Sequence, residues 1–524
     1  MKRLLIISVL FLISMPVFAS YDIRDFGARH DGETLCTEAI QAAIDKCAVA
    51  GGGVVSISAG RWTTGTVYLR DNVTLQIESG ATLLGSRNRD DYARPFKVDP
   101  NSKSITSWAM IAGKNLKNVA IRGRGTIDGQ GDSFRDKTRA RPKCIILEKC
   151  SDVLIEGVRL RNAGSWMQHY IDCDRLVIRD IAVFNHVSFN NDGLNIDSCR
   201  DVTITGCSVD SDDDGIVLKS VSTKPCENVT IGDCIVSSHC NSIKMGTESG
   251  GGFKNITISN CTVCSPRYSK VIYGRQRGLA GLALEIVDGG TMDRIAISNI
   301  AIRGVTVPIF IRLGNRARTY EPDQSKPAIG ALQNVTLNNI VATDCSSTGC
   351  SITGLPDGHA ENISLSNIML SFEGGGQKKQ ASASVPEKET SYPESTMFGQ
   401  LPAWGFYCRH VKGLKLRNIT LKTDQPDLRH ALVCDDVEDM LIDTLDAVCD
   451  ENAVSILRFT NVQNAMITTC RPPKQTPTFL NIQGSKTRGI SLVGNDFSDV
   501  LAAYKAGGDV PQNALTMQGN IARD

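Results

Sequence analysis

The sequence has no excess of charge of either sign, because its 57 Lys and Arg residues nearly match its 56 Asp and Glu residues. Such a chain lacks an overall field that would attract nucleic acid or an anionic membrane, so recognition of a charged ligand must be local. Long apolar runs are equally scarce beyond residue 19, which argues against membrane insertion. The 18 Cys and 7 His show no zinc-site spacing. We therefore expect no nucleic acid partner, no metal and no other cofactor.

One apolar run does occur, at the start of the chain. Lys2 and Arg3 precede the apolar residues 4–15, and residues 17–19 end on Ala19. This order is typical of a secretory signal peptide spanning residues 1–19. It predicts an exported protein, periplasmic or extracellular.

Short apolar segments repeat through most of the chain. Each copy alternates β-branched and polar residues, ends on Gly, Asp or Asn, and continues into Cys or an aliphatic residue, which is typical of a strand and a bend. Copies begin at Val153, Leu176, Val202, Val229, Ile256, Ile295, Val335, Ile363, Leu414, Met440, Ala465 and Ile490. The first five starts are 23, 26, 27 and 27 residues apart. A propeller would need about 40–45 residues per repeat.

These repeats predict an all-β solenoid, a parallel β-helix whose stacked coils share one core. We take it as right-handed from the general crossover preference. Equivalent residues of successive coils should then form ladders about 4.7–4.9 Å apart. One ladder should hold Cys207, Cys234, Cys261, Ile300, Ile340, Ile368 and Ile419. Cysteines on such a ladder are expected to be small core residues rather than disulfide partners, although export permits disulfides.

The two ends of the solenoid and one long gap set the domain organisation. Residues 37–47 have helical apolar spacing behind Thr37, an N-cap candidate, and the glycines 51–53 follow. Such a helix would cover the open strand edges, so we assign residues 20–85 to an N-terminal cap with the first coils. Residues 86–524 form the β-helix, with a long loop at about 371–410. Its aromatic part holds Trp404, Phe406 and Tyr407. They either wall one end of a groove or pack on the side of the solenoid.

Three acidic residues interrupt neighbouring repeats at equivalent points. Asp192 stands in Asn-Asn-Asp-Gly, and Asp213 and Asp214 precede Gly215, 21 residues or about one coil later. Paired carboxylates on a rigid sheet are what glycosidic-bond hydrolysis requires. Adjacent Asp213 and Asp214 would face opposite sides of a regular strand, so a bend is expected there. Asp-rich turns or a calcium site are the alternatives, with ligands from Asp210, Asp212, Asp213 and Asp214.

Several motifs together resemble one family. The chain is similar to the pectin-degrading β-helix hydrolases, glycoside hydrolase family 28, in residues 21–28, 51–55, 80–83, 190–196 and 213–214. The resemblance implies inverting hydrolysis, with Asp213 as the general acid and with Asp192 and Asp214 holding the attacking water. His239 corresponds to the histidine of the family's Gly-His-Gly motif, although both flanking glycines are absent. The resemblance implies that it hydrogen-bonds and tunes the carboxylates.

One motif departs from the family pattern. Where polygalacturonases carry an Arg-Ile-Lys run that grips a galacturonate carboxylate, this chain has Ala283, Leu284 and Glu285. A glutamate there is expected to repel an anionic sugar or to prefer a neutral one such as rhamnose. Other substrate-binding candidates are Lys219, Lys244, Glu248, Arg312 and Arg316.

The sequence therefore predicts a hydrolase of pectic poly- or oligosaccharides, cleaving galacturonate linkages of rhamnogalacturonan and acting from chain ends. Homogalacturonan hydrolysis is the alternative within the family. A calcium-dependent β-helix lyase with a Lys or Arg base, and a carbohydrate-binding solenoid without catalysis, are the alternatives outside it. Oligomeric state is not predicted.

Overall fold

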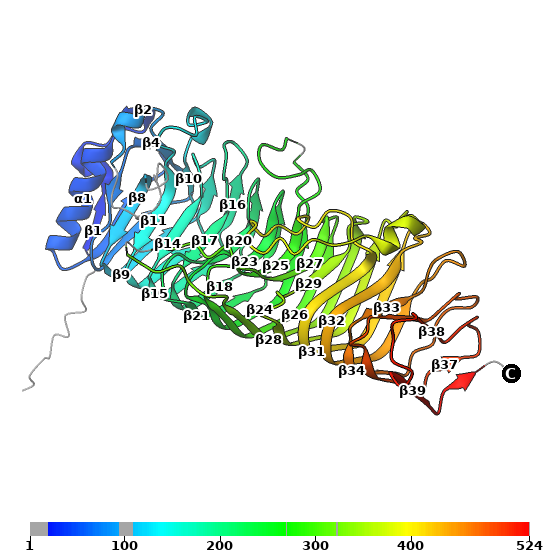
Figure 1. Cartoon of the computed structure of the whole chain (residues 1–524). Coiled ribbons are helices and arrows are strands. Elements are labelled where there is room, and N and C mark those ends of the chain that lie inside the picture. Colours follow the sequence, from blue (N-terminus) through cyan, green and yellow to red (C-terminus); the bar gives the residue numbers. More distant parts are fainter. Residues whose placement is uncertain (1–18, 94–107, 269, 321–322, 523–524) are drawn as a thin grey trace, which may run out of the picture.

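The computed structural model describes residues 19–93, 108–268, 270–320 and 323–522. The expected signal peptide falls on residues 1–19 and so lies, except for Ala19, outside the described residues. In the described part the chain winds into one right-handed parallel β-helix, with 38 strands in a continuous sheet (Figure 1). The predicted fold class is confirmed.

Each coil contributes strands to three ladders. The ladder that carries the candidate site is called the site sheet, and it contains β5 (Val67–Tyr68), β8 (Ala109–Lys114), β11 (Lys143–Glu148), β14 (Gln168–Ile171), β17 (Leu194–Asp197), β20 (Ile216–Ser220), β23 (Asn241–Ser249), β25 (Ala280–Ile286), β27 (Val307–Leu313), β29 (Cys350–Thr353), β31 (Ala403–Thr423), β32 (His430–Ala447), β33 (Leu457–Thr460), β35 (Leu480–Gln483) and β38 (Tyr504–Ala506). The second ladder contains β1 (Ala19–Asp22), β3 (Gly53–Ile57), β6 (Val73–Ile77), β9 (Lys117–Gly123), β12 (Ser151–Glu156), β15 (Asp174–Arg179), β18 (Arg200–Thr205), β21 (Cys226–Gly232), β24 (Gly252–Cys264), β26 (Thr291–Arg303), β28 (Ala331–Cys345), β30 (Ala360–Phe372), the later parts of β31 and β32, β34 (Gln463–Thr468), β36 (Arg488–Val493) and β39 (Leu515–Gln518). The third contains β2 (Asp31–Leu35), β4 (Gly60–Thr64), β7 (Ala81–Gly85), β10 (Thr126–Asp128), β13 (Arg159–Arg161), β16 (Ala182–Asn185), β19 (Ser208–Ser211) and β22 (Ile235–Ser238), and it merges into the longer strands from β24 onward.

The bend after the repeated Val-x-Ile segment explains its Gly, Asp or Asn. These residues have positive φ, for example 55° at Asp233, 57° at Asn260 and 57° at Asn299. Asparagine, aspartate and glycine tolerate that region best. The amide of Asn299 also donates to the side-chain oxygen of Asn260 (3.0 Å), and the amide of Asn339 donates to Asn299 (2.8 Å), so neighbouring coils are joined outside the core.

The predicted ladder of core residues is confirmed. Cys261 pairs with Ile300, Ile300 with Ile340, Ile340 with Ile368 and Ile368 with Ile419. All 18 cysteines are free thiols in this structure, and all but Cys264 and Cys449 are buried.

The one α-helix in the described part, α1 (Thr37–Val49), lies at the N-terminal end of the stack (Figure 1). It buries Ile40, Ala43, Ile44 and Cys47 against the first coils. The N-cap residue is Cys36, not Thr37, whose hydroxyl instead accepts from the Gly65 amide (2.8 Å). Short 3₁₀ turns are η1 (Ile23–Phe26), η2 (Arg89–Asp91), η3 (Gly131–Ser133) and η4 (Lys378–Ser382), and β37 (Asp496–Phe497) pairs with β40 (Ile521–Ala522) at the other end. None of the described helices is long and apolar enough to span a membrane.

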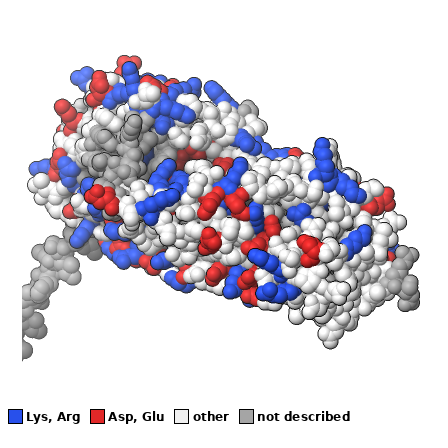
Figure 2. Space-filling model, in the orientation of Figure 1, with Lys and Arg blue, Asp and Glu red and all other residues white. Residues whose placement is uncertain are grey.

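The long loop occupies residues 373–402, between β30 and β31. It runs back along the stack toward the coils of β25 and β23 (Figure 1). Trp404, Phe406 and Tyr407 are not loop residues. They lie in β31, each at most 2% exposed, and none of them lines the pocket beside Asp213 and Asp214. Basic and acidic side chains are interspersed over the face shown in Figure 2, as the near-neutral composition predicts.

Candidate active site

The three acidic residues come together just before two adjacent strands of the site sheet. Asp192 precedes β17 and Asp213 and Asp214 precede β20. The Gly193 amide donates to the Asp214 carbonyl (2.9 Å), so these backbone segments stack directly. All three carboxylates are largely buried, with exposures of 2%, 8% and 5% in chain order. Two segments that are about one coil apart in sequence are therefore in contact in the folded chain.

The local backbone lets both adjacent aspartates face the same region. Asp213 and Asp214 lie in a bend between β19 and β20, as their adjacency required. Two glycines permit the close stacking here. A Cβ on Gly215 would lie 2.5 Å from the Ser242 carbonyl oxygen, and one on Gly193 would lie 2.6 Å from the Gly215 carbonyl oxygen. Any larger residue would separate the coils.

Two of the three carboxyl groups, those of Asp213 and Asp192, hold their protons more tightly than ordinary aspartates. Burial, reinforced by the Asp214 carboxylate, raises the pKa of Asp213 to about 7. Burial and the Asp213 carboxylate raise the pKa of Asp192 well above its usual value. Asp213 accepts from the amide of Asp214 (2.9 Å) and from the side chain of Asn190 (3.3 Å). Asp192 Oδ1 has no hydrogen-bond partner among the described residues.

Asp214 accepts hydrogen bonds from two residues of the neighbouring coil. It accepts from the side-chain amide of Asn241 (2.8 Å) and from the Lys244 ammonium (3.1 Å). Burial alone would lower the pKa of Lys244, but Asp214 and Glu285 outweigh it and raise that pKa well above its ordinary value. Lys244, one of the predicted substrate-binding cations, therefore stands charged beside the acidic cluster.

Glu285 does not act as the exposed, repelling anion that the motif suggested. It is fully buried, and burial raises its pKa to about 8. It accepts from the Thr247 hydroxyl (3.0 Å), and Lys244 Nζ lies 3.9 Å from its Oε2. At neutral pH this position therefore holds a neutral acid next to a cation.

Lys219 and Glu248 form an ion pair (3.0 Å) on the coils flanking the cluster. Burial alone would lower the pKa of Lys219, but Glu248 and Asp192 outweigh it and raise that pKa. Burial alone would raise the pKa of Glu248, but Lys219 and Arg316 outweigh it and lower that pKa. Both residues stay charged.

The site sheet also carries a row of hydrogen-bonded polar residues that no sequence motif predicted. Lys143 Nζ lies 3.0 Å from His169 Nδ1, and His169 Nε2 lies 3.1 Å from Asp197. Lys143 and Lys219 both lie over the Trp166 ring, 4.4 and 4.8 Å from its centre. Burial lowers the pKa of Lys143 to about 7. The sequence spacing could have predicted this contact, since Lys143 and His169 are 26 residues apart, about one coil.

A cleft of about 240 Å³ opens onto Asp213, Asp214 and Lys244. Its other walls come from a loop that no motif marked, the segment with Tyr273 and Arg275, and from the predicted long loop, which contributes Tyr392 and Glu394. Burial raises the pKa of Glu394. The Tyr392 hydroxyl lies 3.4 Å from Lys244 Nζ, although 148 residues separate them in sequence.

Two predicted substrate-binding arginines serve other purposes. Arg312 is 1% exposed and donates to the carbonyls of Glu387 (2.8 Å) and Gly354 (3.0 Å), so it anchors the long loop instead of lining the cleft. Arg316 is ion-paired with buried Asp288, and its nearest approach to Glu248 is 4.0 Å.

The calcium alternative is not supported by the partners of the four aspartates. The Asp210 carboxylate faces His186 (2.9 Å), that of Asp212 takes two backbone amides, and that of Asp214 faces Lys244. They point to different places and share no common centre with Asp213.

His239 lies beside this cluster rather than in it. Its Nδ1 donates to the carbonyl of Arg275 (2.9 Å), and its ring packs edge-on to that of His186, 5.4 Å away between centres. Burial, with His186 adding to it, lowers the pKa of His239. No hydrogen bond joins it to the three carboxylates in the described part of the chain.

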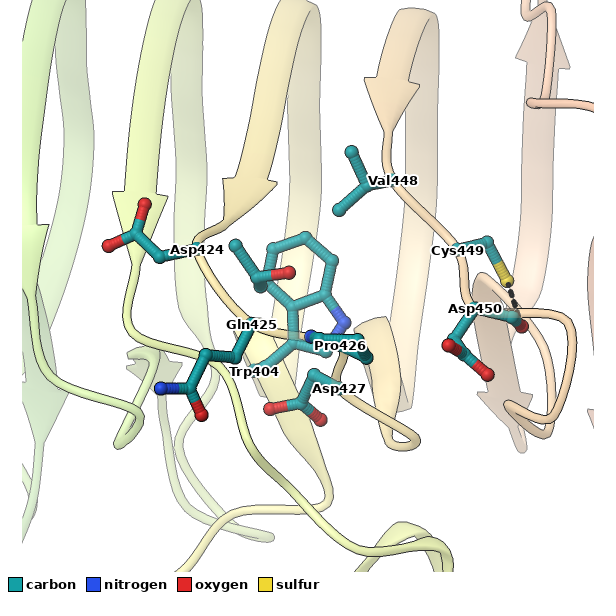
Figure 3. A pocket seen from close by; sticks show the side chains of 9 residues that line it. Trp404, Asp424, Gln425, Pro426, Asp427, Val448, Cys449 and Asp450 are labelled. Atoms are coloured by element: carbon teal, nitrogen blue, oxygen red, sulfur yellow. Dashed lines mark hydrogen bonds between the residues drawn. The ribbon is translucent and has the colours of Figure 1, made fainter.

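Another pocket lies toward the C-terminal coils, lined by Trp404, Asp424, Asp427 and Asp450 (Figure 3). Asp427 is ion-paired with Arg429 (2.7 Å). Asp424 and Asp450 stand on different coils, on either side of the Trp404 ring. This arrangement lacks the close pair of acids found before β17 and β20.

Comparisons with known proteins agree on one relationship. The family model of glycosyl hydrolases family 28 matches residues 56–391. A probable polygalacturonase from Vitis vinifera is 33% identical over 217 residues, 38% of this chain and 44% of that protein. An exo-poly-alpha-D-galacturonosidase from Dickeya chrysanthemi is 37% identical over 118 residues, 21% of this chain and 19% of that protein. The matched region thus spans less than half the length of these curated relatives.

Among solved structures, a hyperthermoactive exopolygalacturonase from Thermotoga maritima superposes with a TM-score of 0.56 at 22% identity, covering 68% of this chain and 87% of that one. At that identity the likeness concerns the fold.

Proposed function

The chain belongs to the glycosyl hydrolases of family 28, and from that premise we propose that it is an exported inverting hydrolase that removes galacturonate from the end of a pectic chain. The observation that carries the proposal is the set of three buried carboxylates, stacked on adjacent coils at the mouth of a cleft and flanked by Lys244.

The roles follow from the environments. In inverting hydrolysis one carboxylic acid protonates the glycosidic oxygen while a carboxylate takes a proton from the water that attacks the anomeric carbon from the opposite face. Asp213, with its raised pKa of about 7, retains a proton to give. Asp214, which accepts from Asn241 and Lys244, orients the water together with the unpartnered oxygen of Asp192. His239 is a positioning residue, because its contacts are with the neighbouring loop.

The long loop supports action at chain ends. Its residues occupy the outer face of the site sheet on the C-terminal side of the carboxylates: the Ser395 hydroxyl donates to the Leu279 carbonyl (3.0 Å), and Phe398 packs against the cluster that includes Ala283 and Phe310. Arg409 and Arg312 hold its backbone carbonyls. A polysaccharide lying along the sheet would meet this loop directly beyond the cleft, which favours binding of a terminal sugar.

The sugar recognised is proposed to be galacturonate. Lys244 in the cleft and Lys219 next to Trp166 supply cations beside an aromatic face, which suits an anionic sugar ring. Because the family's Arg-Ile-Lys run is absent, we propose rhamnogalacturonan as the polymer. Homogalacturonan is the second candidate, and the neutral state of buried Glu285 beside Lys244 favours it specifically.

The test uses the mature protein, its Asp213→Asn variant and, as a matched control, the exposed-site variant Asp201→Asn. Each is incubated with homogalacturonan and with rhamnogalacturonan oligosaccharides, and products are sized and their first-formed anomer is read by proton NMR. We expect single galacturonate residues of inverted configuration from rhamnogalacturonan, lost in Asp213→Asn and kept in Asp201→Asn. Release from homogalacturonan instead would establish the second candidate. Long oligosaccharide products would refute end-wise action, and an unsaturated product would indicate a lyase.

A further inference from the structure

Three residues outside the catalytic carboxylates converge on one buried point. His186, Asp212 and His239 follow β16, β19 and β22, and the strand pairings of Asn185 with Ser211 and of Ser211 with Ser238 place them at the same position on three successive coils. They are at most 2% exposed. The two histidines are two coils apart, which separates their backbones by about 9–10 Å. Yet one ligand atom from each of the three residues lies within 4.8 Å of the others.

Hydrogen bonds fix which nitrogen of each histidine has a free lone pair. A carbonyl can only accept, so His239 Nδ1 carries the proton that it donates to Arg275 (2.9 Å), and Nε2 presents its lone pair. His186 Nε2 donates to the Asp210 carboxylate (2.9 Å), which leaves the lone pair on Nδ1. His186 Nδ1 and His239 Nε2 have no hydrogen-bond partner among the described residues.

The third group is a carboxylate whose orientation is fixed. Asp212 accepts from the backbone amide of Ile272 at one oxygen (2.8 Å) and from that of Tyr273 at the other (2.7 Å). Two unpartnered imidazole nitrogens and a carboxylate therefore lie together in a buried space, and no hydrogen bond joins the three groups in the described part of the chain. A proton on His186 Nδ1 would not give this nitrogen a partner, because it lies 4.0 Å from Asp212 Oδ1, beyond hydrogen-bonding distance. A cation bound by all three groups would give each of them a partner.

We propose that His186, Asp212 and His239 bind a divalent transition-metal ion, zinc foremost. Two imidazoles and a carboxylate are a donor set that zinc prefers, with Co²⁺, Ni²⁺ and Cu²⁺ as competitors. Three atoms no more than 4.8 Å apart share a point about 2.8 Å or less from each. Zinc bonds measure about 2.0–2.2 Å, so shifts below 1 Å bring all three ligands to bonding distance, which fills three of the four positions of a tetrahedral site. The bonds from Asp210 and Arg275 are the outer contacts that orient metal-ligating histidines.

The ion has a structural role. Asp212 and His239 are also the two attachment points of the loop with Tyr273 and Arg275, whose side chains line the cleft, and Arg275 N donates to the His239 carbonyl (2.8 Å). Asp212 directly precedes Asp213. Metal binding thus fastens one wall of the cleft to the coil that carries the acid. The binding itself does not depend on the proposed hydrolysis.

The second histidine cluster of the molecule serves as the contrast. His359 and His410 both bind Asp436 (3.2 and 2.6 Å), and His410 Nε2 lies 3.2 Å from Glu387. Its nitrogens face carboxylates that satisfy them, so no shared ion is needed. His359→Leu is therefore the matched control.

The test measures metal binding on chelator-treated full-length mature protein, by calorimetric titration with Zn²⁺ and by the visible spectrum of Co²⁺. We expect one equivalent bound by the parent, none by His186→Leu or His239→Leu, and one by His359→Leu. Asp210→Asn, which keeps all three ligands, should bind about 10–100-fold more weakly. This graded variant decides the matter even if a histidine variant fails to fold.

Three results would overturn the proposal: no zinc bound by the folded parent at micromolar free metal, unchanged binding in both His186→Leu and Asp210→Asn, or loss of the bound equivalent in His359→Leu alone. Loss of hydrolysis with intact zinc binding would count against the proposed function and leave the metal site standing.

Discussion

Restoring the family lysine at position 285 is expected to harm this protein. Lys244 Nζ lies 3.9 Å from Glu285 Oε2, and two like charges at that separation repel by about 4 kcal/mol at an effective dielectric constant of 20. Glu285 is neutral at pH 7, because burial raises its pKa to about 8. Glu285→Lys therefore introduces this repulsion without removing an existing ion pair. A Cβ on neighbouring Gly246 would lie 2.8 Å from the Glu285 Cβ, so the longer side chain has little room to turn away.

The measurement compares thermal and urea unfolding of the parent, Glu285→Lys, Glu285→Gln and the double variant Lys244→Met/Glu285→Lys. Glu285→Lys should lose about 4 kcal/mol of stability, while Glu285→Gln should stay near the parent. The double variant keeps one cation beside Asp214 and should recover most of the loss. If Glu285→Lys is as stable as the parent and gains turnover of homogalacturonan, Lys244 does not occupy the place of the missing family cation, and the reasoning fails.

Three further outcomes are expected. Asp213→Asn should lower kcat by about 10²–10⁴-fold with little change in thermal unfolding; a variant with parental kcat would exclude Asp213 as the acid. Because the pKa of Glu285 rises from 4.5 to about 8 on folding, its protonated form stabilises the protein fully below about pH 4.5 and that contribution is lost as pH rises through about 8. The parent's melting temperature should thus fall relative to Glu285→Gln between about pH 5 and pH 8, and a constant difference would contradict the shift. Gly215→Ala places a Cβ 2.5 Å from the Ser242 carbonyl oxygen and should cost about 1–3 kcal/mol and reduce kcat, whereas Gly508→Ala, with open space around it, should do neither.

The fold and the acidic cluster were predictable because they depend on spacing that is regular in sequence. Asp192 and Asp213 are about one coil apart, and coil stacking converts that interval into contact. The same rule places Lys244 beside Asp214. Contacts that depend only on the regular coil length can therefore be predicted from the sequence alone.

The contacts that the sequence did not predict are those in which a partner comes from a distant segment. Arg312 was expected at the substrate, but its guanidinium binds a loop carbonyl 75 residues away in sequence. Glu285 was expected to be charged, but its state depends on burial that no motif records. Tyr392 and Glu394 reach the cleft from a loop whose path depends on packing along the outer face of the sheet.

The ladder of amides at the coil bends also determines how this chain tolerates changes in length. Each bend residue of positive φ, such as Asn260 and Asn299, is aligned with its counterpart on the next coil. Removing a single residue from a strand would break this alignment and exchange the inward and outward faces of everything up to the next bend. Adding a whole coil, or a long excursion such as residues 373–402 that leaves and returns at the same bend, preserves it. Relatives and engineered variants should therefore differ by entire coils or by surface loops, and seldom by single-residue insertions within a strand.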